Sequence, residues 1–315
     1  MQAKPLITVI VPSYNSPDLY RTLRSVLSQD YPRIQLIVVD DGSSSFEKEA
    51  VEAFLREGNL EMLQVLVNPQ NRGTVYTMNR ALQESRGEYI FNLAGDDCFA
   101  DDRVLSDWVE EFLATGAKVM TAYRMAFDEN LEQPIRKEPS PEQVQWIRQD
   151  SPQELFEKIA EANFIFGCCT ARSAQAVKQY GLFDERYRLV EDHSMNLKLL
   201  RLGEPIVFFD RVVVNYRGGG TSSPGKYNEV YARDVDSILQ NEVLPYTKNP
   251  KRMRRVYAAW KRDQRLLQKR AAYFQRYEKS GMMKLLIQVW YYSHHPWRTL
   301  CRIPVFIKKR IKGER

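Results

Sequence analysis

The stretch Glu88-Tyr89-Ile90-Phe91-Asn92-Leu93-Ala94-Gly95-Asp96-Asp97 decides the fold of this chain. Its short apolar run is typical of a buried strand, and two carboxylates follow where that strand ends. In open α/β sheets, ligands bind just beyond the carboxyl ends of the strands. Paired carboxylates at this place supply hard oxygen ligands for a divalent cation that carries a phosphorylated substrate. An Asp-Asp pair alone is also typical of a turn or a helix cap, so its surroundings must decide.

Strand and helix patterns alternate through the first hundred residues. Short apolar and β-branched runs predict strands, and apolar residues at helical spacing predict the helices between them. The predicted strands are 6–11, 34–39, 62–67 and 88–93, and the predicted helices are 18–29, 46–57 and 75–85. This alternation predicts an α/β fold with a mostly parallel sheet and helices on both faces.

The pattern continues less regularly up to residue 247. Further helices are predicted at 103–115, 152–162, 191–202 and 227–247, and further strands at 118–123, 206–209 and 212–214. Ser151 and Glu154 form a Ser-x-x-Glu capping box at the start of one of these helices. The polar, proline-containing residues 128–152 are expected to form a surface loop.

Charge divides the chain into two parts. Residues 248–315 carry 20 Lys/Arg against 3 Asp/Glu, whereas residues 1–247 carry 26 against 37. We therefore expect an acidic α/β domain at 1–247 and a basic, mainly helical extension at 248–315. The four cysteines have no metal-site spacing, which favours a reduced, cytoplasmic setting. We recognise no leader and no run of eighteen apolar residues, so we expect no spanning helix.

Polar motifs follow the predicted strands. Val11-Pro12-Ser13-Tyr14-Asn15 ends the first strand, Asp40-Asp41-Gly42-Ser43 ends the second, and Asn71-Arg72-Gly73 follows the third. An aromatic ring can stack on a planar base, a carboxylate can accept hydrogen bonds from a base or ribose, and a glycine allows close backbone approach. Each motif alone is also typical of a strand-to-helix turn.

Two later motifs carry further candidates. Glu191-Asp192 begins a predicted helix, where a carboxylate could take a proton from an acceptor hydroxyl. Acidic residues are favoured in the first turn of any helix, so a purely structural role is the alternative. The glycine-rich stretch 216–223 could close over phosphates, or it could be a plain linker.

In their order and spacing, these motifs resemble the family 2 nucleotide-sugar glycosyltransferases, which have the GT-A (Rossmann-like) fold. The resemblance covers about residues 5–225. It rests on Val11-Pro12-Ser13-Tyr14-Asn15, Asp40-Asp41, Asn71-x-Gly73 with Asn79, Gly87-Glu88-Tyr89-Ile90 with Asp96-Asp97, Gly181-x-Phe183-Asp184-Glu185 and Glu191-Asp192. It implies an inverting transferase that uses a nucleoside-diphosphate sugar and a divalent metal, Mn or Mg.

The resemblance also implies a role for each matching residue. Asp97 would bind the metal, and Asp192 would be the general base with Glu191 beside it. The residues implied in nucleotide-sugar binding are Pro12, Tyr14, Asp40, Asp41, Asn71, Gly73, Asn79, Asp96, Gly219, Gly220 and Ser222. Inversion needs a base on the acceptor side, opposite the leaving diphosphate, and two separate carboxylate sites suit that requirement.

The sequence departs from the family pattern at two places. Ala94 occupies the first position of the usual Asp-x-Asp motif, and the late glycine-rich loop contains no histidine. His193 follows the proposed base, and we expect it to be packed rather than to bind metal. The Gln-x-x-Arg-Trp signature of processive synthases is also missing from the late part of the sequence, which favours addition of a single sugar.

Basic and aromatic residues are interleaved through 248–315. Such segments suit an anionic membrane surface, which we favour, but they also suit nucleic acid or a packing or dimer arm. With the resemblance, we expect transfer of one sugar to a glycan hydroxyl in cell-surface polysaccharide synthesis. UDP is the favoured nucleotide and a lipid-linked acceptor is expected, at the inner face of the plasma membrane.

Three further expectations complete the sequence-based picture. No nucleic-acid partner is expected, although a nucleic-acid binder that uses the basic tail is one alternative function. Self-association into a homo-oligomer stays open. The other alternative is a catalytically inactive scaffold, which the two departures from the family pattern would support.

Overall fold

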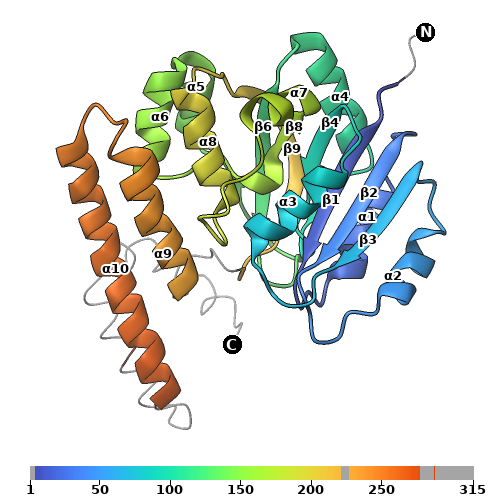
Figure 1. Cartoon of the computed structure of the whole chain (residues 1–315), viewed down its shortest axis with the longest axis horizontal. Coiled ribbons are helices and arrows are strands. Elements are labelled where there is room, and N and C mark those ends of the chain that lie inside the picture. Colours follow the sequence, from blue (N-terminus) through green and yellow to red (C-terminus); the bar gives the residue numbers. More distant parts are fainter. Residues whose placement is uncertain (1–3, 221–226, 277–286, 288–315) are drawn as a thin grey trace, which may run out of the picture.

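The computed structural model describes residues 4–220, 227–276 and 287. Its strands form one nine-stranded sheet in the order β3-β2-β1-β4-β8-β6-β9-β5, with β7 paired to β6 off this path (Figure 1). The strands are β1 (Ile7–Ser13), β2 (Ile34–Asp40), β3 (Met62–Val67), β4 (Tyr89–Asn92), β5 (Cys98–Phe99), β6 (Val119–Phe127), β7 (Pro134–Glu138), β8 (Thr170–Ser173) and β9 (Val207–Tyr216).

Helices cover both faces of this sheet, as the sequence predicted. They are α1 (Leu19–Leu27), α2 (Lys48–Leu55), α3 (Thr74–Glu84), α4 (Val104–Thr115), α5 (Pro141–Gln149), α6 (Pro152–Glu161), α7 (Ala174–Tyr180), α8 (Glu191–Arg201), α9 (Glu229–Ile238) and α10 (Pro250–Arg276), with the short turns η1 (Gly167–Cys169) and η2 (Leu239–Val243). One apolar core lies between the sheet and α1, α2 and α4. A second core lies on the other face, under α3 and the helices from α5 to α10.

The sheet is parallel where strands and helices alternate. β3, β2, β1 and β4 are parallel neighbours, and β6 and β9 are also parallel. β5, β7 and β8 pair antiparallel with their neighbours, so the complete sheet is mixed. The α/β class is therefore confirmed, and the regular βαβ part runs from β1 to β4, over residues 7–92.

The sequence prediction was wrong for residues 128–152. This segment contains β7, an exposed strand paired with β6, and α5, which begins at a capping box formed by Ser140 and Gln143. The predicted strands 206–209 and 212–214 are one strand, β9. Its pairing with β6 changes register opposite the β6 residues from Ala122 to Arg124. The capping box of Ser151 and Glu154 is confirmed at the start of α6.

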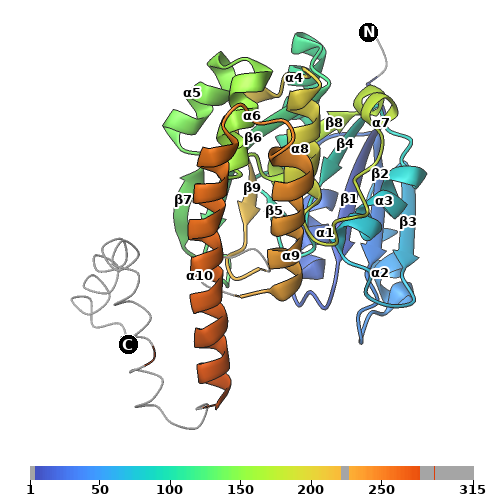
Figure 2. The same cartoon turned by 60° about the vertical axis from the view of Figure 1, so that its left-hand side comes forward.

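Helices α9 and α10 lie side by side at one end of the described part of the molecule, and α10 runs beyond the end of α9 (Figure 2). Met253 and Tyr257 of α10 are buried in the core of the body. Ion pairs from Arg252 to Glu161 and from Lys261 to Asp236 fix the same half of the helix. Within the described ranges, no helix has the length and apolar character needed to cross a membrane.

Candidate active site

The predicted nucleotide-binding residues come together because three parallel strands end at the same edge. The carbonyl of Ser13 accepts the N–H of Asp41 at 2.8 Å, which joins the ends of β1 and β2. The carbonyl of Pro12 accepts the N–H of Gly95 at 2.9 Å, which joins β1 to the turn after β4. Tyr14 is half exposed at this edge and leaves its ring available for stacking.

Asp40 and Asp41 are both buried at the end of β2. The carboxylate of Asp40 accepts hydrogen bonds from the N–H and hydroxyl of Ser43, at 2.8 and 2.5 Å. The carboxylate of Asp41 accepts the backbone N–H groups of Arg72 and Gly73, both at 2.8 Å. Asp41 therefore holds the loop that follows β3 against the end of β2. The motifs 40–43 and 71–73 thus form one continuous wall of the candidate site.

Asn71 and Gly73 bring a distant segment to this wall. Arg188 donates from Nη2 to the side-chain oxygen of Asn71 at 2.6 Å. Gly73 has a φ of +91°, and a Cβ added there would lie 2.3 Å from Cγ of Arg188. A residue with a side chain could not bring these two segments together without strain.

Asn79 is held in the interior by hydrogen bonds to the segment that precedes α8. It is buried in α3, where its amide both accepts the N–H of Phe183 and donates to the carbonyl of Phe183, each at 2.9 Å. It also donates to Glu185 at 3.1 Å. The structure thus shows Asn79 fastening the segment that precedes α8, and its part in sugar binding stays a prediction.

Asp97 is buried just after β4, and Asp96 beside it is partly buried. Oδ1 of Asp97 accepts the backbone N–H of Arg217 at 2.8 Å. Oδ2 is buried and has no hydrogen-bond partner in the described part of the chain. Burial raises the pKa of Asp97 well above its usual range, and Cys168 and Asp96 add to the effect.

This environment fits a divalent cation. A buried carboxylate oxygen without a partner is costly, and a cation would both satisfy it and restore the ionised form. No group of three or more Asp, Glu, His or Cys side chains suited to a metal occurs among the residues that the structure describes. The two adjacent aspartates would therefore have to share the cation with phosphate oxygens and water, as is common for Mg²⁺.

Asp192 begins α8 beside the turn η1. Its Oδ2 accepts the backbone N–H of Gly167 at 3.0 Å and the amide of Asn163 at 3.2 Å. A Cβ added to Gly167 would lie 3.1 Å from Cβ of Asp192 and 3.2 Å from Oε1 of Glu191, which leaves little room for any other residue. The carboxylate is therefore held in one orientation at a helix N-terminus.

Glu191 and His193 flank this carboxylate in different ways. Burial, with the neighbouring Asp192 as the second cause, raises the pKa of Glu191 to about 8. His193 is buried, and its Nε2 lies 2.9 Å from the carbonyl of Ile159. The expectation that His193 is packed is confirmed, and burial lowers its pKa.

The start of the glycine-rich loop lies near Asp97, because Arg217 provides the N–H that Asp97 accepts. Nε of Arg217 contacts Oδ2 of Asp18 at 3.1 Å and donates to the carbonyl of Glu129 at 2.7 Å. Gly219 and Gly220 follow directly, whereas Ser222 lies outside the described residues. The structure thus brings the end of β9 to the same edge as the end of β4.

Sequence reasoning missed several residues that build the site. Gly167 and Asn163 bind Asp192, and Asn68 donates to Oδ1 of Asp41 at 2.8 Å. The only local signal was Gly167, a glycine within the apolar run 164–170. Contacts made by backbone N–H groups leave no trace in residue type, so a single sequence cannot reveal them.

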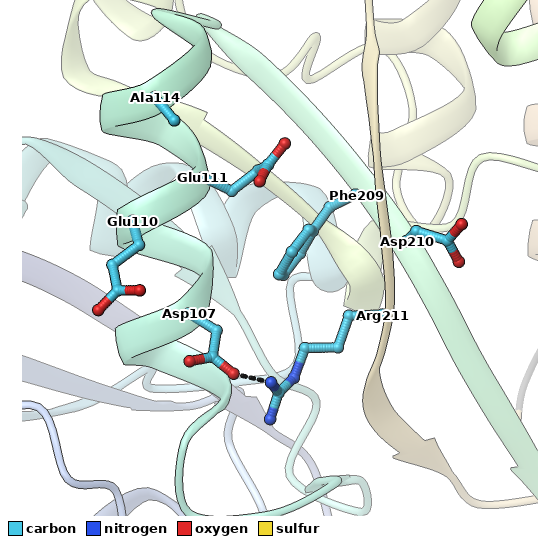
Figure 3. Close-up of a pocket in the computed structure, with 7 residues that line it drawn as sticks. All are labelled: Asp107, Glu110, Glu111, Ala114, Phe209, Asp210 and Arg211. Atoms are coloured by element: carbon cyan, nitrogen blue, oxygen red, sulfur yellow. Dashed lines mark ion pairs between the residues drawn. The ribbon is translucent and has the colours of Figure 1, made fainter.

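A separate cavity lies between α4 and β9 (Figure 3). Its lining residues are Asp107, Glu110, Glu111, Ala114, Phe209, Asp210 and Arg211. Arg211 is paired with Asp107 (Figure 3), and Asp210 is paired with Arg148, so Glu110 and Glu111 leave the cavity acidic. None of the predicted site residues lines it, and its charge would repel a diphosphate.

The chain matches a known family model, and it has named relatives. The family model described as glycosyl transferase family 2 matches residues 8–181, more than half of the chain. The putative colanic acid biosynthesis glycosyl transferase WcaA of Escherichia coli (strain K12) is 27% identical over 72% of this chain and 80% of its own length. The putative teichuronic acid biosynthesis glycosyltransferase TuaG of Bacillus subtilis (strain 168) is 34% identical over 32% of this chain, and that match spans only 40% of the relative.

Solved structures share the fold. S. aureus TarS 1–349 in complex with UDP-GlcNAc has a TM-score of 0.58 at 19% identity, over 80% of this chain and 70% of that one. The mannosyltransferase PcManGT from Pyrobaculum calidifontis, in complex with GDP-Man and Mn²⁺, has a TM-score of 0.57 at 17% identity, over 100% of this chain and 89% of that one. At these identities the likeness concerns the fold alone. The extent of the family match decides the assignment: the chain belongs to glycosyl transferase family 2.

Proposed function

We propose that this chain is an inverting glycosyltransferase that moves one sugar from a nucleoside-diphosphate sugar to a hydroxyl of a glycan. One observation carries the proposal. Asp97 and Asp192, 95 positions apart in the sequence, lie near the same turn: Gly167 donates to Asp192, and the next residue, Cys168, is close enough to Asp97 to contribute to the rise in its pKa. Two carboxylates held near one turn suit the two separate tasks of an in-line displacement.

The residues support the following chemistry. Asp192 takes the proton from the acceptor hydroxyl while that oxygen attacks the anomeric carbon of the donor sugar. The bond from the anomeric carbon to the diphosphate oxygen breaks, and the electron pair leaves with the nucleoside diphosphate. Because attack and departure are on opposite faces, the configuration at that carbon inverts.

Asp97, with Asp96 beside it, would hold the divalent cation, Mn or Mg. When bound, this cation would neutralise charge that develops on the leaving diphosphate. The N–H of Arg217 occupies Oδ1 of Asp97, so Oδ2, which has no partner in the described part of the chain, would be the oxygen available to hold the cation. The base and ribose would lie against Pro12, Tyr14 and the Asp40-Asp41 wall.

The donor and acceptor are narrower proposals. UDP is the favoured nucleotide, and a neighbour with the same fold is in complex with UDP-GlcNAc. Relatives named for colanic acid and teichuronic acid biosynthesis support a role in making a cell-surface polysaccharide. We propose a lipid-linked glycan as acceptor, which would place the enzyme at the cytoplasmic face of the plasma membrane.

Helix α10 supports the membrane part of this proposal. It carries ten Lys/Arg and one acidic residue, Asp263. Seven exposed basic residues recur at helical spacing on one face: Lys251, Arg254, Arg255, Arg262, Arg265, Lys269 and Arg276. Met253 and Tyr257 lie on the opposite face and pack into the body. A solvent-facing basic face on a helix anchored by its other side suits anionic headgroups.

A donor screen tests the proposed function. Purified full-length chain is mixed with UDP-, dTDP- or GDP-sugars, Mn²⁺ and a lipid extract as acceptor, and released nucleoside diphosphate is measured. We expect release with one donor class, stimulated by the extract and abolished by EDTA. Absence of release and of Mn²⁺-dependent UDP binding by calorimetry would contradict the proposal and favour an inactive scaffold.

A further inference from the structure

The guanidinium of Arg124 is stacked between two aromatic rings. Its central carbon lies 3.5 Å from the ring centre of Phe166 and 4.0 Å from that of Tyr216. Nε and Nη2 both reach Oε2 of Glu138, at 2.9 and 2.8 Å. The side chain of Arg124 is only 13% exposed, so this arrangement is built into the interior rather than spread on the surface.

Each ring directly precedes a backbone N–H that holds a proposed catalytic carboxylate. Phe166 precedes Gly167, whose N–H donates to Asp192 at 3.0 Å. Tyr216 precedes Arg217, whose N–H donates to Asp97 at 2.8 Å. The stack of Phe166, Arg124 and Tyr216 therefore lies between two backbone N–H groups. The N–H of Arg217 binds the metal carboxylate Asp97, and the N–H of Gly167 binds the proposed base Asp192.

We propose that Arg124 is a positioning residue that sets the spacing between the Asp97 and Asp192 sites by stacking between the rings of Phe166 and Tyr216. This inference rests on the proposed function of those two carboxylates. Arg124 comes from β6, the strand next to β9 in the sheet, and its pair with Glu138 of β7 holds the guanidinium plane in one orientation. The plane then acts as a spacer of fixed thickness.

The chemistry of arginine explains the choice of residue. A planar, delocalised cation can stack on one aromatic ring on each face and still donate hydrogen bonds at its rim. Lysine has the charge but no plane, and methionine has the length but neither charge nor plane. Both substitutions should therefore let the two rings approach or tilt, although the volume stays similar.

The test measures both activity and the two anchoring amides. In full-length Arg124→Lys and Arg124→Met we expect kcat for sugar transfer to fall by about 10- to 100-fold, because small displacements of reacting groups have effects of this size. Binding of UDP with Mn²⁺ should stay within about twofold of wild type. Hydrogen exchange should be faster at the amides of Gly167 and Arg217 than in wild type.

Arg136→Met is the matched control, because Arg136 also pairs with Glu138 but is 61% exposed, and within the described residues the cation that stacks on Phe166 and Tyr216 is Arg124. It should leave kcat and the exchange of both amides unchanged. If Arg124→Met does not fold, Arg124→Lys carries the test, with the same expected loss.

Three outcomes would overturn the proposal. They are a wild-type kcat in a folded Arg124→Met protein, faster exchange spread evenly over the whole fold, or a raised KM for acceptor at unchanged kcat, which would mean direct substrate binding. If wild type transfers no sugar at all, the proposed function fails. The exchange rates at Gly167 and Arg217 still decide whether Arg124 is the spacer.

Discussion

Asp97 accepts a hydrogen bond from the backbone N–H of Arg217 at 2.8 Å, across 120 positions in the sequence. This contact closes the end of β9 onto the end of β4 and leaves the second carboxylate oxygen of Asp97 buried without a partner among the described residues. The proposed metal carboxylate is thus fixed by the loop that would cover the diphosphate. Its position depends on backbone geometry rather than on another acidic residue.

Asp97→Asn should abolish metal-dependent turnover while the fold survives. The asparagine oxygen can still accept the N–H of Arg217, but the charge needed by a cation is lost. We expect sugar transfer to fall by at least about 100-fold, in line with the loss of one electrostatic stabiliser of the transition state. Mn²⁺-dependent UDP binding, measured by calorimetry, should weaken at least about tenfold.

The control for Asp97→Asn is Asp101→Asn, which removes an exposed carboxylate paired with Arg211 a few residues further on. It should keep both turnover and binding. The melting temperature of Asp97→Asn should equal or exceed that of wild type, because the substitution removes a buried carboxyl group whose raised pKa shows that its charge is disfavoured there. Full turnover in Asp97→Asn would rule out its metal role.

Asp192→Asn separates donor binding from transfer. If Asp192 is the general base, its loss should lower kcat by about 10²- to 10⁴-fold. UDP and Mn²⁺ should bind as in wild type, because the proposed donor-binding residues lie at the ends of β1, β2 and β4, whereas Asp192 begins α8. Steady-state transfer and calorimetry on the same preparation provide the measurement. A variant with equally weakened donor binding would instead indicate that Asp192 supports the fold of the whole site.

Removal of basic charge from α10 tests the membrane proposal. The combined variant Arg254→Gln, Arg262→Gln and Arg265→Gln takes three cations from one exposed face. At about 1 kcal/mol for each basic residue near an anionic surface, binding should weaken by about 3 kcal/mol, or on the order of 100-fold. Co-sedimentation with phosphatidylserine-containing vesicles at 0.1 M salt measures it.

A triple variant of the body serves as the control for charge alone. Lys48→Gln, Arg56→Gln and Arg86→Gln remove the same charge from exposed positions far from α10 in the sequence. This protein should still bind vesicles almost as well as wild type. Equal loss in both triple variants would mean that net charge, and not the face of α10, attracts the membrane. Preference for duplex DNA over vesicles would favour the nucleic-acid alternative.

The N-terminal βαβ part was predictable from sequence because local pattern and tertiary fold agree there. Runs such as 34–39 are apolar on both faces, as a buried parallel strand requires, and the helices between them have one apolar face. The segment 128–152 was not predictable in the same way. β7 is exposed along its length, so it lacks the apolar alternation that reveals a strand, and its pairing with β6 is a tertiary contact.

The candidate site also has a part that is predictable from sequence and a part that is not. Carboxylates at strand ends are visible in the sequence, and the structure places Asp40, Asp41, Asp96 and Asp97 at one edge, where their ligand roles stay predictions. The backbone amides of Gly73, Gly167 and Arg217 bind Asp41, Asp192 and Asp97 respectively, and Arg124 stacks on the residue before Gly167. These depend on which distant segments meet, and residue types alone do not encode that.

Glu191 should make the stability of the protein depend on pH between about 5 and 8. Its pKa is raised from 4.5 to about 8 in the folded chain, chiefly by burial. The folded state therefore keeps a proton that the unfolded state loses above its ordinary pKa. By linkage, this contribution to the free energy of unfolding is complete below pH 4.5 and is lost as pH rises towards 8.

Glu191→Gln removes the titration, so its melting temperature should fall less than that of wild type between pH 5 and 8.5, and the variant should be the more stable one at the upper end. Thermal unfolding without nucleotide or divalent metal measures both slopes. Glu110→Gln, on an exposed position of α4, should keep the wild-type slope. Parallel slopes for wild type and Glu191→Gln would show that Glu191 is already ionised in the folded protein at neutral pH.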